Sequence, residues 1–536
     1  MRLRRKEKMK CEPHGIDLAL MAAGAVLTGL TLVFPSIGFL EWVTMIPLLW
    51  GAYRIASDEH LGLGRAYGYG FLTVLTYYIV IYHWFIDLYP LDFVGLDSAS
   101  SIVVVVAGWL GLSLLQAIPG GLIFLFFRLL HRWGLFERLP LLRPFVFSAL
   151  WVIFEWSSTL SWTGVPWGRL CLGQIEMLPM LQSASLLGSY FVSFLILAVN
   201  GLLAYAILYR PRWILCVSVS AALVVCNLTY GLIARGVTDV EGGDLPVAVI
   251  QGNINSHEKW SSNSLAKTKH AYANLTRAAA AEGAKLVVWP ETVLPYDLHY
   301  RLDLQSFLSD LAEECEITLI VGAYHQAGES EEYNALFLIT PDGAMQEGYY
   351  AKRHLVPFGE YVPMQDFIRT FLPPLAELSE LGGDLTAGEN SALFETEYGR
   401  IGSLICFDSI YEQLTLASVR DGANIMVVSS NDSWFYDSAA VYQHQAQSQL
   451  RAIECGRYVV RSANTGISTV IAPDGTILEW IDPLESGYAV TSIRAIDTPT
   501  VYTVLGNLFV YLCIALVLTS GTLAVVWKRR GRKGKE

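Results

Sequence analysis

The chain has 536 residues, of which 53% are hydrophobic and only 16% are charged, and its formal net charge is −12. This acidic balance speaks against nucleic-acid binding, which needs a basic face. The eight cysteines show neither CxxC pairs nor metal-ligand spacing, so we expect no disulfide framework, no zinc site and no other metal or organic cofactor.

Eight stretches of the chain are candidate membrane spans, since a transmembrane helix needs about 20 mostly apolar residues. They centre on Ile16–Pro35, Ile37–Ala56, Ala66–Ile86, Ser101–Phe127, Leu139–Glu155, Leu178–Leu208, Trp213–Ile233 and Thr503–Trp527. The first has a basic start, as a cleaved signal peptide would. Its apolar stretch is long and more spans follow, so we interpret it as a span.

The charges of the connecting loops predict the orientation, because Lys and Arg are enriched in cytoplasmic loops. Arginines occupy alternate loops, at Arg54 and Arg65, then at Arg128, Arg132, Arg138 and Arg143, then at Arg210 and Arg212. Basic runs also open and close the chain. We therefore expect both termini in the cytoplasm, residues 1–240 to form a membrane domain with seven spans, residues 241–497 to form a periplasmic domain, and residues 498–536 to hold span eight and a cytoplasmic basic tail.

An outer loop between the fifth and sixth spans is rich in tryptophan. It holds Trp162 and Trp167. Tryptophan prefers the membrane interface, so these residues could be plain anchors. The alternative is that the loop helps to form a wall beneath the periplasmic domain.

From about Gly242 to Ile496 the pattern changes to short apolar runs that alternate with helical segments. Strands are predicted at residues 247–251, 285–289, 317–323, 335–339, 401–406, 424–429, 459–461 and 467–471. Helices are predicted at residues 264–281, 302–315, 411–419 and 439–456, and Pro-Asp-Gly turns lie at Pro341 and Pro473. The alternation predicts an α/β domain whose helices cover buried sheets.

Three predicted strands end on residues that can carry chemistry. Glu291 follows the second strand, Cys406 ends a later strand, and Lys352 lies between them in the chain, with Glu360 eight residues further on. A thiol nucleophile needs a base to take its proton and a cation to stabilise the charges that form. Taken singly, such residues are more often structural or solvated, so the hypothesis depends on the ordered set.

At these residues the chain resembles the nitrilase, or carbon–nitrogen hydrolase, superfamily, whose Glu–Lys–Cys triad follows this order. Four further segments are similar to the apolipoprotein N-acyltransferase family: Phe39–Trp50, Gly164–Trp167, Ser429–Trp434 and Arg461–Ile467. The resemblance implies a polytopic α-helical membrane domain of about eight spans plus an α/β domain with the nitrilase-like α-β-β-α sandwich. It also implies that Glu291 is the general base, Lys352 the oxyanion-stabilising cation and Cys406 the nucleophile, with Glu360 as a supporting carboxylate.

The resemblance extends to residues around this set. Phe407 matches the aromatic residue that often follows the nucleophile, whereas Asp408 stands where the family often has Glu and is one methylene shorter. Trp260, Asn431 and Trp434 match segments near the substrate. The apolar stretch Phe367–Leu381 matches a mobile loop that dips toward lipid.

The activity implied is transfer of an acyl chain from a membrane phospholipid to the α-amino group of the N-terminal diacylglyceryl-cysteine of apolipoproteins, through a thioester on Cys406. The resemblance implies a monomer in the bacterial inner membrane. Three alternatives remain open: a membrane-tethered amidase of the nitrilase type, a catalytically silent membrane scaffold, and a Cys–His protease that would use His354 or His444.

Overall fold

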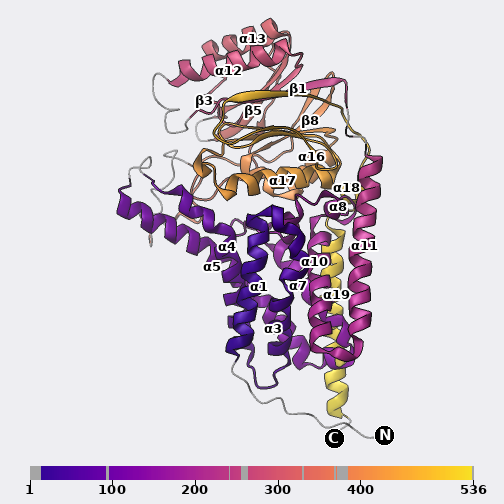
Figure 1. The fold of residues 1–536 in the computed structure, drawn as a ribbon. Coiled ribbons are helices and arrows are strands. Elements are labelled where there is room, and N and C mark those ends of the chain that lie inside the picture. The colour runs from indigo at the N-terminus through magenta and orange to yellow at the C-terminus, as the bar shows by residue number, and fades with distance from the viewer. Residues whose placement is uncertain are drawn as a thin grey trace.

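The computed structural model describes residues 14–91, 96–238, 240, 242–254, 264–328, 331–366, 370 and 384–533. Figure 1 shows two parts, a bundle of long helices and an α/β sandwich on one end of it. Trp260 lies outside the described residues, and so does the segment Phe367–Leu381 apart from Thr370.

Six helical stretches of the described chain are long and apolar enough to cross a membrane: Gly15–Val33, Leu63–Leu88, Ser98–Arg132, Ser189–Leu208, Arg210–Val237 and Leu508–Arg530. They contain the helices α1 (Gly15–Val33), α4 (Leu63–Ile81), α5 (Ser98–Arg132), α10 (Ser189–Leu208), α11 (Trp213–Val237) and α19 (Leu508–Lys533). The protein is therefore a multi-spanning membrane protein.

The expected second and fifth spans are shorter than a membrane-crossing helix. The second is divided into a 3-10 turn at Pro35–Leu40, α2 (Glu41–Thr44) and the 12-residue α3 (Ile46–Ser57), and the fifth is the 15-residue α7 (Arg143–Ser157). A proline in the first turn of α3 and of α7 fixes where each begins, because proline has no N–H to bond a preceding turn. Both pack inside the bundle against α10, so the count of eight spans is approximate.

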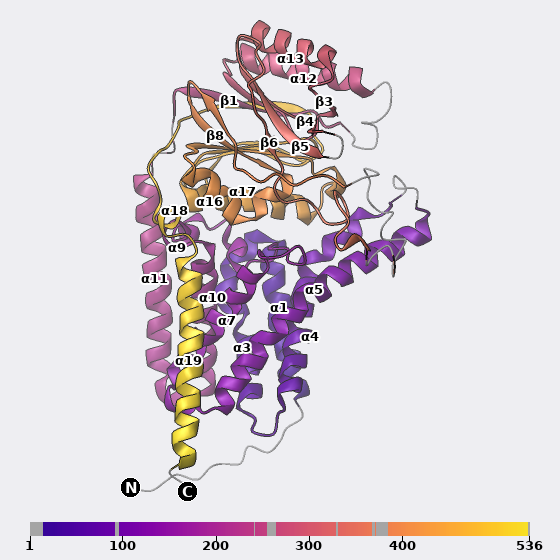
Figure 2. The same ribbon diagram turned by 180° about the vertical axis from the view of Figure 1, so that it is seen from behind.

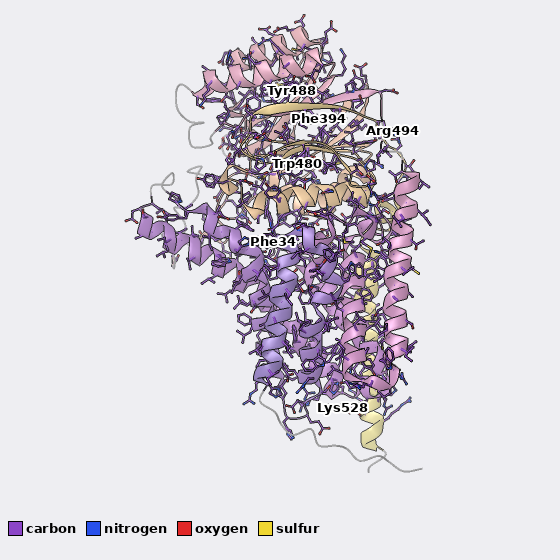
Figure 3. The ribbon with its side chains drawn as sticks, in the orientation of Figure 1. Phe34, Phe394, Trp480, Tyr488, Arg494 and Lys528 are labelled. Atoms are coloured by element: carbon purple, nitrogen blue, oxygen red, sulfur yellow. The ribbon has the colours of Figure 1, made fainter. Side chains whose placement is uncertain are left out.

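The expected sixth span is also divided. It consists of α8 (Leu178–Leu181), α9 (Ala184–Leu187) and α10, and α9 ends at Gly188, whose φ of +81° suits glycine. Figure 2 shows that α19 ends at the far side of the bundle from the sandwich. In Figure 3, Phe34 marks the end of α1 beneath the sandwich and Lys528 marks the opposite end of the bundle.

The sandwich consists of two sheets with helices on both outer faces, as the resemblance implies. The first sheet has the order β13-β1-β2-β4-β5-β6 with β3 beside β4, and the second has the order β12-β11-β10-β9-β8-β7. The strands of the first are β1 (Leu245–Gln251), β2 (Leu286–Val288), β3 (Leu294–Asp297), β4 (Thr318–Gln326), β5 (Glu332–Ile339), β6 (Tyr350–Ala351) and β13 (Gly487–Ile493). Those of the second are β7 (Leu393–Thr396), β8 (Gly399–Ile405), β9 (Ile425–Ser430), β10 (Val459–Ala463), β11 (Ser468–Ile471) and β12 (Ile477–Ile481).

Four main helices cover the two sheets. Helices α12 (Ser264–Ala281) and α13 (Leu302–Cys315) cover the first sheet on the side away from the bundle, and α16 (Glu412–Arg420) and α17 (Ala439–Cys455) lie between the second sheet and the bundle (Figure 1). Apolar side chains of both sheets, such as Val249 and Val427, fill the space between the layers. This packing removes the apolar faces of both sheets from water.

A buried polar contact joins the sandwich to the bundle. Arg169 forms an ion pair with Glu412 of α16, and both side chains are 1% exposed. The Tyr190 hydroxyl also donates to Glu412, at 2.8 Å, and the backbone nitrogen of Ser189 donates to Glu454 of α17, at 2.9 Å. Because charged groups are rarely buried without partners, these contacts fix how the sandwich sits on the bundle.

The tryptophan-rich loop contributes to the same contact. The indole nitrogen of Trp167 donates to Gln443 of α17 at 2.6 Å, and Trp167 is buried. Its ring lies 5.8 Å from that of Trp84 and 6.1 Å from that of Phe435. Trp167 therefore belongs to a wall beneath the sandwich and is not a free interfacial anchor.

Candidate active site

The proposed base and cation come from the first sheet, and the proposed nucleophile comes from the second. Glu291 lies three residues after β2, Lys352 follows β6 directly, and Cys406 follows β8 directly. Glu291 and Lys352 are buried, whereas Cys406 is partly exposed. The two sheets thus bring together three side chains that are far apart in the sequence.

Lys352 bridges two carboxylates. Its Nζ donates to Glu291 Oε1 at 3.0 Å and to Glu360 Oε1 at 2.9 Å. Burial acts to lower the pKa of Lys352, but the two carboxylates outweigh it and hold the pKa well above its usual value. Lys352 is therefore a charged ammonium at neutral pH.

Both oxygens of the Glu291 carboxylate are held. Besides Lys352, Oε1 accepts a hydrogen bond from the Asn334 side chain at 2.7 Å, and Oε2 accepts one from the backbone nitrogen of Asn431 at 2.9 Å. Asn334 also donates to Glu360, at 3.2 Å. These bonds orient Glu291 and leave it the acceptor capacity that a general base needs.

Cys406 occupies a strained backbone position. Its φ is +48°, a left-handed conformation that side chains other than glycine rarely adopt. Burial of the thiol and the negative charge of Glu291 raise the pKa of Cys406 well above that of a free thiol, against the opposing charge of Lys352. The resting group is therefore a thiol, and a base has to take its proton as it attacks.

Asp408 ties the turn at Cys406 to the segment after Lys352. Its carboxylate accepts hydrogen bonds from the backbone nitrogens of His354 at 2.7 Å, Arg353 at 3.2 Å and Ile405 at 3.1 Å, and from the Tyr350 hydroxyl at 2.8 Å. Burial raises the pKa of Asp408, while Lys352 and these hydrogen bonds oppose the rise. The shorter side chain at this position still reaches all its partners.

Sequence reasoning missed a buried charged group beside Cys406. Asp432 pairs with Arg461 Nη2 at 2.8 Å and with His444 Nδ1 at 2.8 Å, and His444 Nε2 lies 3.2 Å from the backbone oxygen of Cys406. Burial acts to raise the pKa of Asp432, but His444 and Arg461 outweigh it and hold that pKa well below its usual range. Sequence reasoning connected His444 only with a Cys–His protease and missed its pairing with Asp432. The arginine inside the predicted strand at residues 459–461 was a further signal, because a charge in a buried strand needs a partner.

The remaining predicted residues lie around this centre. The Phe407 ring lies 6.1 Å from that of His354 and 5.4 Å from that of Tyr411. Trp434 is half-buried in the short turn Ser433–Phe435, which follows Asn431. The backbone of Asn431 thus contacts Glu291, and Trp434 follows Asn431 three residues later in the chain.

Family models match both parts of the chain. One described as carbon-nitrogen hydrolase matches residues 246–504, and one described as apolipoprotein N-acyltransferase N-terminal domain matches residues 24–202. A solved carbon–nitrogen hydrolase from Helicobacter pylori is 18% identical, with a TM-score of 0.37, and the match covers 46% of this chain and 88% of that one. The sandwich and the matching models define a membrane protein that carries a carbon–nitrogen hydrolase domain.

Relatives that match nearly the whole chain identify the family within this class of membrane protein. An apolipoprotein N-acyltransferase from Geobacter metallireducens is 33% identical over 523 residues, which cover 95% of each chain. One from Gloeobacter violaceus is 31% identical over 541 residues, which cover 99% of this chain and 98% of the relative. The chain belongs to the apolipoprotein N-acyltransferase family, and it is an acyltransferase of the bacterial inner membrane.

Proposed function

We propose that the protein transfers an acyl chain from a membrane phospholipid to the α-amino group of the N-terminal diacylglyceryl-cysteine of apolipoproteins, through a thioester on Cys406. The observation that carries the proposal is the buried Glu291–Lys352 pair, at 3.0 Å, beside a thiol whose pKa is raised. A protonated thiol with an oriented carboxylate nearby suits attack on an ester carbonyl with proton removal in the same step.

The first half-reaction forms the thioester. Glu291 takes the proton of the Cys406 thiol while sulfur bonds to the ester carbonyl carbon. Lys352 and backbone N–H groups stabilise the negative charge on the carbonyl oxygen. The carbon–oxygen bond to the glycerol then breaks, and the leaving oxygen takes the proton from Glu291 and departs as a lysophospholipid.

The second half-reaction consumes the thioester. The free α-amino group of the acceptor attacks the thioester carbonyl, and Glu291 takes a proton from that nitrogen. The carbon–sulfur bond breaks, Cys406 regains the proton, and the N-acylated lipoprotein leaves. Because one product departs before the second substrate reacts, ping-pong kinetics follow.

The membrane part supports substrates that stay in lipid. Helices α16 and α17 lie between the second sheet and the bundle (Figure 1). The aromatic rings of Trp84 and Trp167, from the bundle, both pack against that of Phe435, from the sandwich. A tethered amidase for small soluble molecules would need one anchor and no such wall. We further propose that Trp434, Asn431 and Trp260 take part in substrate binding, with Phe407 and Glu360 supporting the site.

The orientation is part of the same proposal. The end of the described chain at α19 lies at the face of the bundle opposite the sandwich, and the loop arginines predict that this face is cytoplasmic. We propose that the sandwich is periplasmic, where lipoproteins with a free α-amino group are exposed. One chain supplies all the proposed groups, so we expect a monomer to suffice.

The test is to trap the intermediate. Purified protein is incubated with a phospholipid that carries a labelled acyl chain, without acceptor, and the label is located by mass spectrometry. We expect a hydroxylamine-sensitive label on Cys406 that moves to a diacylglyceryl peptide when this is added. Cys406→Ala and Glu291→Gln should carry no label, whereas Cys315→Ala, which changes a half-buried cysteine of α13, should carry it normally.

The outcomes separate the alternatives. Absence of label together with hydrolysis of small amides would favour the tethered amidase. Absence of both would favour the scaffold. A label that persists in Glu291→Gln but disappears in His444→Ala would favour a Cys–His mechanism instead.

A further inference from the structure

A second group of chemically active side chains lies on the far face of the first sheet. Strand β4 alternates its faces: Tyr324 packs with Leu355 and Leu385, whereas Val321 and Ala323 pack with the core under α12 and α13. His325 follows on the Val321 and Ala323 face, away from the candidate active site. There it meets Asp297 and His299, which end and follow β3.

The three side chains bring their donor atoms together. One nitrogen of each imidazole and one carboxylate oxygen all lie within 4.8 Å of one another. The rings of His299 and His325 have their centroids 4.6 Å apart. Ligands of one Zn²⁺ at bond lengths of about 2.0–2.2 Å lie at most about 4 Å apart, so small side-chain rotations suffice to bring these atoms onto one ion.

The surrounding structure holds two of the three ligands in place. Asp297 Oδ1 accepts a hydrogen bond from the backbone nitrogen of His299, and Oδ2 accepts one from that of Gln326, both at 2.7 Å. Each oxygen keeps a lone pair for a further partner. The His325 ring packs against Tyr349 with a centroid distance of 4.2 Å, which limits its rotation.

One atom of the group lacks a polar partner. Nδ1 of His325 is buried and has no hydrogen-bond partner within the described part of the chain. A buried nitrogen without a partner is unfavourable by about 1–3 kcal/mol. The side chain of His299 is 47% exposed and that of Asp297 is 14% exposed, so an ion could enter from solvent and keep a water ligand.

We propose that Asp297, His299 and His325 form a binding site for a divalent transition-metal ion of the Zn²⁺ class. Two imidazoles favour such an ion over Mg²⁺ or Ca²⁺, which prefer oxygen ligands. With one carboxylate and one water they complete a four-coordinate site. No short sequence pattern predicts this group, because it contains no cysteine and its two histidines are 26 positions apart in the chain.

A second group, Cys406, Asp432 and His444, also has donor atoms within 4.8 Å of one another. It is a poor cation site, because the Arg461 guanidinium already pairs with Asp432 at 2.8 Å and lies 3.2 Å from His444 Nδ1. A metal ion there would have to displace that positive charge. The proposal is therefore restricted to the group at Asp297.

An ion at this site would join two segments next to the candidate active site. It would tie the end of β3 to the end of β4, and β3 begins three residues after Glu291. Binding to the folded protein alone raises its stability by mass action. The site would thus stiffen the segment that carries the proposed base without contacting it.

The test uses the full-length protein in detergent, purified without a polyhistidine tag and freed of metal with EDTA. Zn²⁺ is titrated by calorimetry, and thermal unfolding is followed with and without Zn²⁺. We expect one equivalent of bound Zn²⁺ and a higher Tm. His299→Ala and His325→Ala should each weaken binding by at least about tenfold, a loss known even for residues that only support metal ligands.

Two controls keep the result specific. His270→Ala, which removes an exposed histidine of α12, should bind Zn²⁺ as the natural chain does. Cys406→Ala should do so as well. The proposal is overturned if the natural chain shows no saturable Zn²⁺ binding, if His299→Ala binds with unchanged affinity, or if Cys406→Ala abolishes binding. Because the His299 side chain is 47% exposed, its variant is expected to fold.

Discussion

Asp408 accepts a hydrogen bond at 2.7 Å from the backbone nitrogen of His354, and this bond joins the turn that carries Cys406 to the segment that follows Lys352. The two segments belong to different sheets, so the contact sets the distance between the proposed nucleophile and the proposed cation. The side chain of Asp408 is fully buried, and its other oxygen accepts from Ile405 and Tyr350. Position 408 therefore needs a carboxylate that accepts on both oxygens.

Asp408→Asn should lower both stability and kcat. The amide presents an NH₂ group to the backbone N–H donors on one side, and a buried donor left unpaired costs about 1–3 kcal/mol. Asp408→Glu keeps both acceptors and should retain most of the activity. Thermal unfolding and the rate of acyl transfer measure the two effects. Equal behaviour of Asp408→Asn and the natural chain would contradict this role.

Alkylation of Cys406 should rise with pH without levelling off near neutrality. Burial raises the pKa of its thiol well above the usual value, so at pH 7 almost all of it is protonated. In Glu291→Gln, where the proposed base cannot take the proton during attack, the rate with iodoacetamide, followed by mass spectrometry, should grow about tenfold per pH unit, whereas free cysteine levels off above its pKa of about 8.5. A plateau near pH 7 would mean that the resting group is a thiolate.

His354 should make the protein less stable in mild acid. Burial, helped by the charge of Lys352, lowers the pKa of His354 to about 4. In the unfolded chain the value is about 6.5, so the unfolded state takes up a proton first as the pH falls. The contribution of His354 to stability is complete above pH 6.5 and is lost between pH 6.5 and pH 4.

The protein should lose roughly 3 kcal/mol of unfolding free energy, because the pKa of His354 differs between the unfolded and folded states and each unit of difference corresponds to about 1.4 kcal/mol. His354→Gln removes the titrating group, so its Tm should fall less between pH 7 and pH 4.5 than that of the natural chain. The comparison is the difference between the two pH values within each protein. If both proteins lose the same number of degrees, His354 does not contribute to acid sensitivity.

Removal of one partner of the Arg169–Glu412 ion pair should strongly destabilise the protein. Arg169→Met leaves the buried Glu412 carboxylate with Arg451, at 3.8 Å, as its remaining cation, and breaking a buried pair in this way costs about 3–5 kcal/mol. Adding Glu412→Gln removes the carboxylate that has lost its closest cation and should recover part of the loss. Thermal unfolding of the two single variants and the double variant gives the coupling energy. Additive losses would show that the pair does not act as a unit.

Much of the sandwich could be predicted because its long strands and helices have clear periodicity. The helices at residues 264–281 and 302–315 match α12 and α13, and the predicted strand at residues 424–429 overlaps β9. The order of Glu291, Lys352 and Cys406 near strand ends was also readable from the sequence. Their meeting in space was not, because β6 pairs antiparallel with β5 and β8 belongs to the other sheet. The family resemblance was confirmed by relatives that match the whole chain.

Other features depend on contacts that no local pattern records. Strands β6 and β7 have only two and four residues and form by pairing with their neighbours. The second expected span, which is divided, and the fifth, which is one short helix, have a proline in the first turn of α3 and of α7 and pack inside the bundle. The group of Asp432, His444 and Arg461 joins three elements, so only the folded chain reveals it.

The contact between Arg169 and Glu412 also has a consequence for how the protein is made. The two residues are 243 positions apart, and Arg169 precedes its partner in the chain. During synthesis the membrane helices around Arg169 therefore emerge before the carboxylate that will neutralise it. The bundle cannot reach its final packing at this place until α16 has folded against it, so folding of the sandwich and completion of the membrane part are coupled.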